Sequence, residues 1–467
     1  MYTLLLINPV EKKSGLGAYK TSSMTPLSLA YVAALTPEDK YKIVIIDESI
    51  ETLDYPEADI VGITSYTTHV CRAYEIAQVY RKKSVPVVMG GIHVSTMPDE
   101  ALNYCDAVVI GEAESSWHKV LDDFENKHLQ SKYYAELLPL ENMPFPNRKY
   151  MQNDHYLWGT ILTSRGCPMD CSFCSVTRFN GRKFRRRKIE DVISELLEIK
   201  NKFVLIVDDN ILGHEVSGGD KDTDGKRWLE QFFIAIVKNK IKKYFYVQAS
   251  LQLGENVKLL KLAYKAGVHV ALIGIESVEL DSLKIYNKNL NAAYVKKHRY
   301  LELIKNIRKS GIVIVGCFIL GCDNDTVRSF KKTLDFILES RIDILQITKP
   351  TPLPGTKFYN ELYEHNRIID TNYPDAWKHY KFTRMLFKPL WLEIKEVYQG
   401  VYYIKKNYYA FRTKMKRFFQ TLFDTKSIIS TIIMLLLNSS YEKAFLNSDI
   451  YQEYDMRELE KKFNFKN

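Results

Sequence analysis

Short apolar runs that alternate with helical patterns fill the first third of the chain. Each run has four or five residues, most of them branched aliphatics, and ends in polar residues or glycine, which is typical of strands buried in a parallel sheet. The runs cover residues 4–7, 43–46, 60–63, 85–89 and 107–110, and helical patterns lie between them, as at 27–35 and 73–82. The alternation predicts a doubly wound α/β domain over residues 1–140, whose ligands would sit beyond the carboxyl ends of the strands.

A stretch with three prolines in nine residues, 138–146, interrupts this pattern, and we predict a linker over residues 141–158. The alternation then resumes with longer helical patterns near 188–200, 226–239, 255–266, 294–310 and 325–340. Six apolar runs lie between them, at 160–163, 203–207, 245–249, 268–275, 313–320 and 344–348. The series resembles a partial (β/α)6 barrel of the TIM type over residues 159–355, in which the loops at the carboxyl ends of the strands build the site.

Residues 356–467 are expected to form a mainly helical extension. Between Trp391 and Phe419, seven Lys and Arg residues stand against two acids, and apolar positions recur at three- and four-residue steps, which predicts an amphipathic basic helix. Three interpretations compete: a cap on the open side of the barrel, a helix lying on a membrane surface through residues 391–437, or an RNA-binding segment. Nucleic acid is the weakest of these, because no RNA-binding module is recognisable.

Composition narrows the classes of protein that the chain can belong to. The net charge of +10 is uneven: residues 1–140 carry 12 Lys and Arg against 19 Asp and Glu, a balance of −7, so the remainder carries +17. Seven scattered cysteines do not form a disulfide framework, and no secretory signal precedes the first apolar run, so a reducing cytoplasm is expected. The longest uncharged apolar run, 427–437, is far shorter than the ~20 residues of a spanning helix.

The clearest chemistry lies at residues 163–187, TSRGCPMDCSFCSVTRFNGRKFRRR, which contain Cys167, Cys171 and Cys174. This spacing puts three thiolates on one short loop, where they can hold three irons of a [4Fe–4S] cluster and leave the fourth iron open. Zinc would normally need a fourth Cys or His at matching spacing, which is not seen nearby. An open iron indicates catalysis rather than simple electron transfer.

The pattern CxxxCxΦC, with Phe173 before the last cysteine and Gly166-Cys167-Pro168 opening the loop, resembles the radical S-adenosylmethionine (SAM) enzymes. The resemblance implies that SAM chelates the open iron and is cleaved to a 5′-deoxyadenosyl radical by an electron from the cluster. A reductant such as flavodoxin or ferredoxin would supply that electron. Most of the basic run at 182–188 reads as solvated surface, but one arginine could pair with the SAM carboxylate.

Further SAM contacts are expected at the carboxyl ends of the barrel strands. Asp208 or Asp209 occupies the place where many radical SAM enzymes carry Gly-Gly-Glu, and Glu276 matches the family's ribose-binding position. The segment from Gly316 to Gly321 loosely resembles the family's adenine-binding GxIxG, with one residue too many. The expected SAM contacts are Phe173, Asp208, Asp209, Gln248, Ser250, Glu276, Gly316 and Gly321.

The strand ends of the first domain, GGIHVSTMPDEAL followed by DAVVIGEAE, resemble the Rossmann-like cobalamin-binding domain that precedes the barrel in cobalamin-dependent radical SAM enzymes. The first turn, 8–13, lacks DxHxxG, so the resemblance implies cobalamin bound without a histidine on cobalt. The expected cobalamin contacts are Thr64, Ser65, Thr67, Gly90, Gly91, His93, Gly111 and Glu112. A packing role for His93, and a flavodoxin-like domain without cofactor, are the alternatives.

The resemblance implies a cobalamin-dependent radical SAM methyltransferase that acts on an unactivated carbon of a lipid, peptide or small metabolite. The C-terminal part is similar to that of a subgroup that includes hopanoid-modifying proteins. A ring-forming or rearranging enzyme without net methylation is the main alternative. A methylthiotransferase ranks low because only Cys71 and Cys105 could serve a second N-terminal cluster, and a non-enzymatic iron–sulfur or cobalamin protein ranks low as well. The sequence indicates neither the substrate nor a catalytic side chain.

Overall fold

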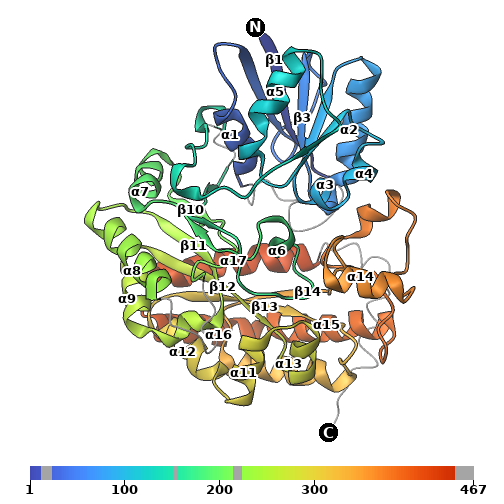
Figure 1. Ribbon diagram of the computed structural model, residues 1–467. Helices are drawn as coiled ribbons and strands as arrows, with labels where there is room; N and C mark the ends of the chain where they lie inside the picture. The colour runs from blue at the N-terminus through green and yellow to red at the C-terminus, as the bar shows by residue number, and fades with distance from the viewer. Residues whose placement is uncertain (12–23, 152–155, 214–222, 447–467) are drawn as a thin grey trace.

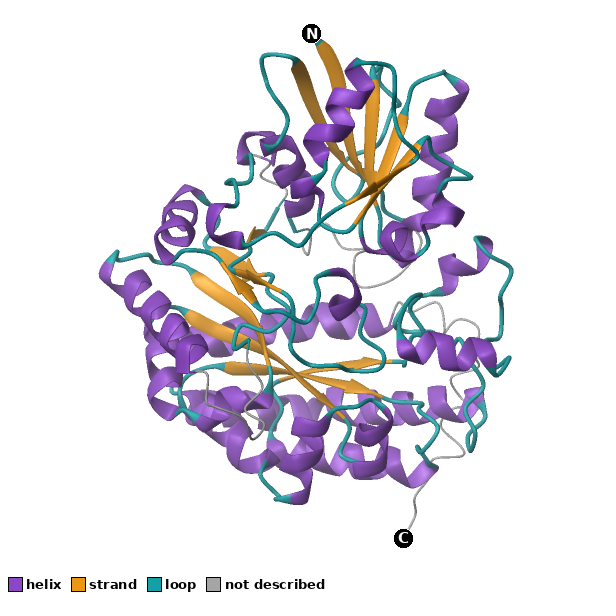
Figure 2. Cartoon of the chain, in the orientation of Figure 1, coloured by secondary structure: helices purple, strands orange, loops and turns teal. Residues whose placement is uncertain are grey.

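The computed structural model describes residues 1–11, 24–151, 156–213 and 223–446, and it places one α/β domain above a larger α/β body (Figure 1). Each part is built around a parallel sheet with helices outside it (Figure 2). The apolar side chains of the two parts join in one continuous buried core. None of the helices in the described ranges combines the length and apolar character needed to cross a bilayer.

The N-terminal sheet has the order β2-β1-β3-β4-β5-β6, with all neighbours parallel. Its strands are β1 (Tyr2–Asn8), β2 (Tyr41–Asp47), β3 (Ile60–Thr64), β4 (Val87–Gly90), β5 (Ala107–Ile110) and β6 (Lys132–Tyr134). The helices around it are α1 (Leu27–Ala34), α2 (Val70–Lys82), α3 (Ile92–Thr96), α4 (Pro98–Ala101) and α5 (Trp117–Glu125). The five predicted strands are confirmed, and the short edge strand β6 was not predicted.

The second sheet has the order β14-β13-β12-β11-β10-β7 and is also parallel. Its strands are β7 (Trp158–Ile161), β10 (Phe203–Ile206), β11 (Tyr244–Ala249), β12 (Val268–Glu276), β13 (Val313–Ile319) and β14 (Ile344–Thr348). All six match predicted runs, which confirms the partial barrel. A two-stranded hairpin, β8 (Ser164–Arg165) with β9 (Arg185–Arg186), brackets the cysteine loop and its helix α6 (Val176–Phe179).

Helices cover the outer face of this sheet, because the strand residues that point outward are apolar and pack against the apolar side of each helix. The helices of this body before the C-terminal extension are α7 (Ile189–Glu198), α8 (Thr223–Lys238), α9 (Val257–Lys265), α10 (Leu280–Ile285), α11 (Asn289–Lys296), α12 (Tyr300–Lys309), α13 (Val327–Ser340) and α14 (Lys357–Glu364). The single helix predicted at 294–310 is wrong. It is divided between α11 and α12, and His298 between them has φ 52°, which a helix does not permit.

The C-terminal extension contains three helices, α15 (Ile394–Tyr409), α16 (Phe411–Thr425) and α17 (Ile428–Leu446). The single basic helix predicted at 391–419 is therefore two helices, since Ala410 has ψ 141° and breaks the helix there. Helix α17 packs Ile433 and Met434 against the inward-facing side chains of β12, β13 and β14. Helix α17 thus covers the inner face of the partial barrel. The segment 391–419, for which a cap was predicted, forms α15 and the first part of α16, which pack against α13 and α12 instead.

Candidate active site between the two domains

The cysteine loop begins at the β8–β9 hairpin, at the carboxyl end of the barrel sheet. Gly166 has φ +89°, and a Cβ there would lie 2.3 Å from the carbonyl oxygen of Lys183, so only glycine fits this close approach. The N–H of Cys167 donates to the carbonyl of Gly181 at 3.3 Å. The glycine that precedes the first cysteine is therefore explained by backbone packing within the loop.

The segment after β12 and the start of α14 hold the middle of this loop. Ser172 donates its N–H to the carbonyl of Tyr286 at 3.1 Å and its hydroxyl to that of Ile285 at 3.0 Å, and it accepts from the N–H of Phe358 at 3.0 Å. The Phe173 ring packs edge-on against Tyr286, with centroids 5.3 Å apart. Phe173 thus anchors the loop, and a direct contact with SAM stays a prediction.

The three cysteines are half-buried in this loop, and the N–H of Cys174 donates to the carbonyl of Cys171 at 3.2 Å. Burial raises the pKa of the Cys167 thiol to about 11 and that of Cys174 to about 12, and the neighbouring thiols of the set add to both shifts. No three His, Cys, Asp or Glu side chains in the described ranges converge on one ion. A shared loop with separated thiols fits a multi-iron cluster, whose irons are held by different cysteines.

The two acids after β10 differ in their burial and in their hydrogen-bond partners. Asp208 is 1% exposed and accepts the N–H of Thr163 at 2.7 Å, the N–H of Ser164 at 3.1 Å and both of their hydroxyls. Its carboxylate therefore ties the entry of the cysteine loop to β10. Asp209 is half-buried and accepts from Asn180 at 3.2 Å, and burial raises its pKa to about 6. Of the two predicted contacts, Asp209 has the carboxylate that faces the cysteine loop.

Glu276 ends β12 at a bulge and has φ 64°, which is unusual for a residue with a side chain. Its Oε1 lies 2.8 Å from Nζ of Lys288, and both side chains are mostly buried. Burial opposes the ammonium charge, but Glu276 and the thiol of Cys171 outweigh that effect and raise the pKa of Lys288. Lys288 therefore links the predicted ribose-binding acid to the cysteine loop.

The remaining predicted SAM residues are spread over β11 and β13. Gln248 is half-buried, and the Ser250 hydroxyl is buried without a hydrogen-bond partner in the described part of the chain, so it can serve a ligand. Gly316 lies inside β13, where a Cβ would meet Ile342. Gly321 donates its N–H to Asp325 at 2.7 Å. These glycines pack against protein, and their adenine contact stays a prediction.

The predicted cobalamin contacts gather at the carboxyl ends of β3, β4 and β5. Ser65 is 2% exposed, and its hydroxyl has no partner within the described residues. Gly91 has φ +97°, and a Cβ there would lie 2.7 Å from the Ser65 carbonyl oxygen. The other members of this edge are Thr64, Thr67, Gly90 and Gly111. Close backbone packing and an unsatisfied hydroxyl fit a ligand that lies against this edge.

His93 is fully buried, although the sequence indicated a ligand contact. Its ring lies 3.1 Å from the Thr67 hydroxyl and 3.3 Å from a Glu100 carboxylate oxygen, and it packs edge-on against Trp377 with centroids 5.1 Å apart. Burial lowers its pKa. The structure favours the alternative packing role, because the ring joins the first domain to the segment after the barrel.

Glu112 is bound by arginines of the barrel. Its carboxylate lies 2.9 Å from Arg165 and accepts both terminal nitrogens of Arg185, and Arg165 also lies 2.6 Å from Glu114. The Glu112 side chain is 3% exposed. Its carboxylate therefore joins the two domains instead of facing a ligand. The solvated surface expected for the run at 182–188 is wrong for Arg185 and Arg187, both of which are buried in ion pairs.

Tyr66 lies at the boundary between the two domains. It follows β3 and is 61% exposed, yet burial raises the pKa of its hydroxyl, and the carboxylate of Asp209 across the boundary adds to the shift. The Tyr66 hydroxyl therefore lies within electrostatic range of Asp209, at the strand end of the other domain. Figure 1 shows α3 of the upper domain facing α6 of the cysteine loop at this boundary.

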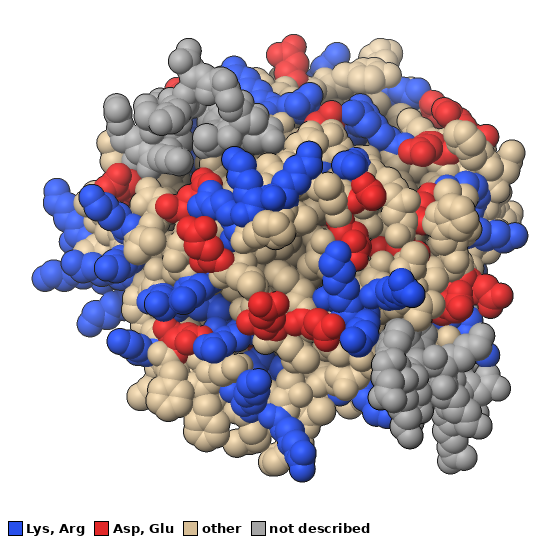
Figure 3. Space-filling model, turned by 90° about the horizontal axis from the view of Figure 1, so that it is seen from below, with Lys and Arg blue, Asp and Glu red and all other residues tan. Residues whose placement is uncertain are grey.

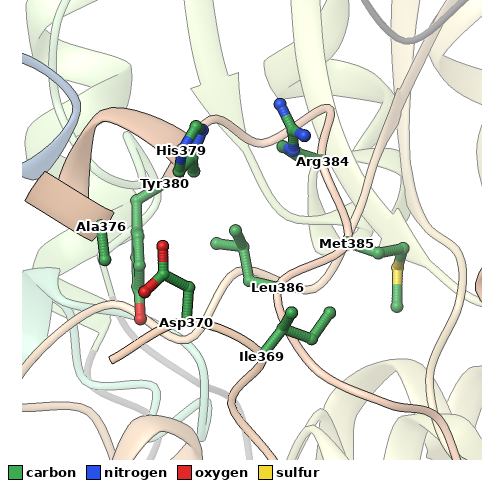
Figure 4. A pocket seen from close by; sticks show the side chains of 8 residues that line it. All are labelled: Ile369, Asp370, Ala376, His379, Tyr380, Arg384, Met385 and Leu386. Carbon is green, nitrogen blue, oxygen red and sulfur yellow. The ribbon is translucent and has the colours of Figure 1, made fainter. Parts of the chain in front are cut away.

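A separate cavity of about 190 Å³ lies within the segment after α14 (Figure 4). Asp370, His379 and Arg384 give it a polar rim, and apolar residues of the same segment complete it. None of the predicted site residues lines this cavity. The candidate site is therefore assigned to the residues at the strand ends of the two domains.

The comparisons with known families agree with this arrangement. The model of the B12 binding domain matches residues 14–121, and the model of the radical SAM superfamily matches residues 161–337, which include the three cysteines. The chain is a cobalamin-dependent radical SAM enzyme. The predicted family and the fold class of this radical SAM enzyme are thus confirmed.

Relatives of the enzyme include methyltransferases and a cyclase. It is 28% identical over 430 residues to bacteriochlorophyllide d C-12(1)-methyltransferase of Chlorobaculum tepidum, which is 88% of each chain. It is 27% identical to hopanoid C-2 methylase of Rhodopseudomonas palustris, over 74% of this chain and 66% of the relative. It is 22% identical to the anaerobic magnesium-protoporphyrin IX monomethyl ester cyclase of Rubrivivax gelatinosus, over 95% of this chain and 83% of the relative.

Among solved structures, the radical SAM enzyme resembles the cobalamin-dependent S-adenosylmethionine radical enzyme OxsB with aqua-cobalamin bound. The TM-score is 0.65 at 17% identity, over 98% of this chain and 76% of that chain. At this identity the likeness shows the fold, including the stacking of the two α/β domains.

Sequence reasoning missed several residues that the structure brings to the site. Lys288 lies in a connection between α10 and α11, and nothing in its local sequence shows that this lysine is buried. Arg165 stands two residues before Cys167, and that position beside an acidic strand end, GEAE, could have indicated an ion pair. Tyr66 lies within the TSYT loop after β3, and its sequence context does not separate it from an ordinary exposed tyrosine.

Proposed function

We propose that this radical SAM enzyme methylates an unactivated carbon of its substrate with the help of cobalamin. The single observation that carries the proposal is the ion pair across the domain boundary. Glu112, which follows β5 of the B12 domain, lies 2.9 Å from Arg165, two residues before Cys167 of the cysteine loop. Two methyltransferases among the relatives support methylation. The proposed division of the chain is 1–140 for the cobalamin domain, 141–158 for the linker, 159–355 for the barrel and 356–467 for the helical extension.

In this proposal Cys167, Cys171 and Cys174 hold a [4Fe–4S] cluster, and the barrel strand ends hold SAM. The bound cofactors supply a carbon-centred radical and a transferable methyl group. The protein binds and orients them: Asp209 and the Ser250 hydroxyl offer an acceptor and a donor to SAM. Asp208, whose oxygens are already occupied, positions the loop.

Cobalamin would lie against the glycine turns at Gly91 and Gly111 and the hydroxyl of Ser65. No histidine is expected on cobalt. His93 is buried between Glu100 and Trp377, and the Nδ1 of His69 accepts the N–H of Glu11 at 3.1 Å, so both rings are engaged with protein. Tyr66 would then lie on the cobalamin side of the domain boundary.

The test is the mass of the product of the anaerobically reconstituted enzyme with candidate substrates, a reductant, SAM and cobalamin. A gain of about 14 mass units, together with formation of 5′-deoxyadenosine, is expected for methylation of carbon. The control is the Cys167→Ala, Cys171→Ala, Cys174→Ala protein, which should lose both products, while Cys105→Ala, a buried thiol of the other domain, should keep them.

Ring formation is the second candidate, because the cyclase relative matches 95% of this chain. A loss of about 2 mass units without a transferred methyl group would establish that reaction and overturn methylation. Product formation without any 5′-deoxyadenosine would contradict both, because each depends on the radical.

A further inference from the structure

Helix α16 exposes an apolar stripe that no other helix covers in the described part of the chain. Phe411, Met415, Phe419 and Phe423 are spaced four residues apart, which places them along one side of the helix. They are 75%, 41%, 48% and 72% exposed. Monomeric proteins rarely leave several large aromatic side chains together in water, so this side of α16 indicates an interaction surface.

Helix α17 extends this apolar surface. Its inner side packs on the barrel sheet, but five aliphatic residues on the outer side stay exposed. They are Ile428, Ile429, Ile432, Leu435 and Leu436. The two helices lie side by side, and an ion pair of 2.9 Å between Lys414 of α16 and Glu442 of α17 joins the start of one to the end of the other. We call the exposed sides of α16 and α17 the apolar face.

The charges around the apolar face are positive. Arg412, Lys416 and Lys426 are exposed beside the stripe. The two acids of α16 and α17 are both neutralised within the protein, Asp424 by Arg308 and Arg341, and Glu442 by Lys414. The end of the molecule remote from the N-terminal domain carries Lys and Arg side chains interspersed with Asp and Glu (Figure 3).

We propose that the apolar face docks on the surface of an anionic phospholipid bilayer. Apolar side chains would enter the boundary between headgroups and acyl chains, and the exposed cations would lie at the anionic headgroups. A second copy of the chain fits less well, because a twofold dimer would bring the same cations of both copies together. The partner is therefore an anionic lipid surface.

The attachment of α16 fixes how the enzyme would sit on a bilayer. Thr421 donates to Asp343 at 2.7 Å, and Asp424 pairs with Arg341, so the helix is fastened at the amino end of β14. The cysteine loop lies at the opposite, carboxyl end of the strands. The docked enzyme would therefore hold its cofactor space away from the membrane.

The test is co-sedimentation of the full chain with vesicles of phosphatidylcholine, with and without phosphatidylglycerol. We expect binding that requires the anionic lipid, because the exposed cations are attracted to its headgroups. Part of the binding should persist at high salt, because the aromatic side chains insert into the bilayer. Replacing Phe411 and Phe423 by Ser should weaken binding at least about tenfold, since each buried aromatic side chain contributes substantially. Replacing Arg412, Lys416 and Lys426 by Gln should weaken binding at low salt by about a hundredfold.

The matched control is the Leu197→Ser, Ile234→Ser protein, in which two exposed apolar residues of α7 and α8 are changed. It should bind as the unchanged protein does, and far-ultraviolet circular dichroism should show that all variants are folded. Absence of vesicle binding, or equal loss in the control, overturns the proposal. Light scattering that shows a dimer, which the Phe411→Ser, Phe423→Ser change turns into a monomer, would assign the face to a second copy instead.

Discussion

Two adjacent acids, Asp208 and Asp209, differ in burial, and we expect them to differ in role: Asp208 positions the cysteine loop, whereas Asp209 is proposed to bind SAM. Asp208 accepts four hydrogen bonds from Thr163 and Ser164, whereas Asp209 accepts from one amide and faces the cysteine loop. We expect Asp208→Ala to destabilise the protein by several kcal/mol, because it leaves buried donors unpaired. Asp209→Ala should leave stability within about 1 kcal/mol and weaken SAM binding by roughly tenfold or more.

Urea unfolding and equilibrium SAM binding to the reconstituted proteins would measure both effects. Asp209→Asn is the matched variant, since it keeps the size and removes the charge. Equal effects of the two alanine changes on SAM binding, with no difference in stability, would contradict the division of roles.

Lys288 is the second residue whose role follows from its neighbours. A positive charge beside Cys171 stabilises the more negative, reduced state of a cluster held there. Lys288→Met is therefore expected to lower the reduction potential of the cluster by on the order of tens of millivolts, and Lys288→Arg should restore most of the loss. Redox titration followed by electron paramagnetic resonance measures the change. An unchanged potential in the methionine variant would show that Glu276 neutralises the lysine charge entirely.

The extent to which these residues could be predicted depends on whether the signal is local. The cysteines and Phe173 share one motif, and the glycines follow apolar runs, so the sequence alone located them. Lys288 acts only through a fold that brings the segment after β12 against the cysteine loop. Glu112 was predicted at the right edge of the sheet but with the wrong partner, because its arginines are 53 and 73 residues away along the chain.

At the scale of elements, the docking of α17 makes stability depend on pH. His269 of β12 is 6% exposed and lies 2.9 Å from the Ser430 hydroxyl, and burial lowers its pKa to about 4 from 6.5. As the pH falls below 6.5, His269 binds a proton in the unfolded chain but stays neutral in the folded chain. Because of His269, the free energy of unfolding should therefore fall by about 2 kcal/mol between pH 7 and pH 5.

Urea unfolding of the unchanged protein and of His269→Gln at both pH values measures this cost. On acidification, the variant should lose less unfolding free energy than the unchanged protein. The difference between the two proteins should equal the contribution of His269. The interpretation fails if the two proteins lose stability in parallel.

Among the elements, strands were predicted better than helix breaks and short hairpins. Buried parallel strands are continuous apolar runs, which a sequence displays directly. The breaks at His298 and Ala410 carry no proline or glycine, so tertiary packing alone ends those helices. The β8–β9 hairpin has two residues in each strand and consists of arginines and a serine, so no apolar period marks it.

For the whole molecule, the ion pairs of Glu112 are expected to hold the two domains in one arrangement. Glu112→Gln would leave the largely buried guanidinium groups of Arg165 and Arg185 without their shared carboxylate, which costs about 3–5 kcal/mol. The exposed pair of Glu38 and Lys149 provides the matched control, since Glu38→Gln removes only a solvent-screened ion pair and should leave stability nearly unchanged. Thermal unfolding and small-angle scattering would measure stability and domain separation. Similar losses in both variants would contradict a special role for the buried cluster.

The same ion pairs bear on how such enzymes could be recombined. A chimera that takes its first domain from a relative would place a foreign strand end against Arg165 and Arg185, and two buried cations would lose their counter-charges. A successful exchange would have to carry Glu112 and Glu114 together with both arginines, although the proposed domain boundary lies near residue 140. The unit that can be transplanted is therefore larger than the domain, and it reaches into the loop that carries Cys167.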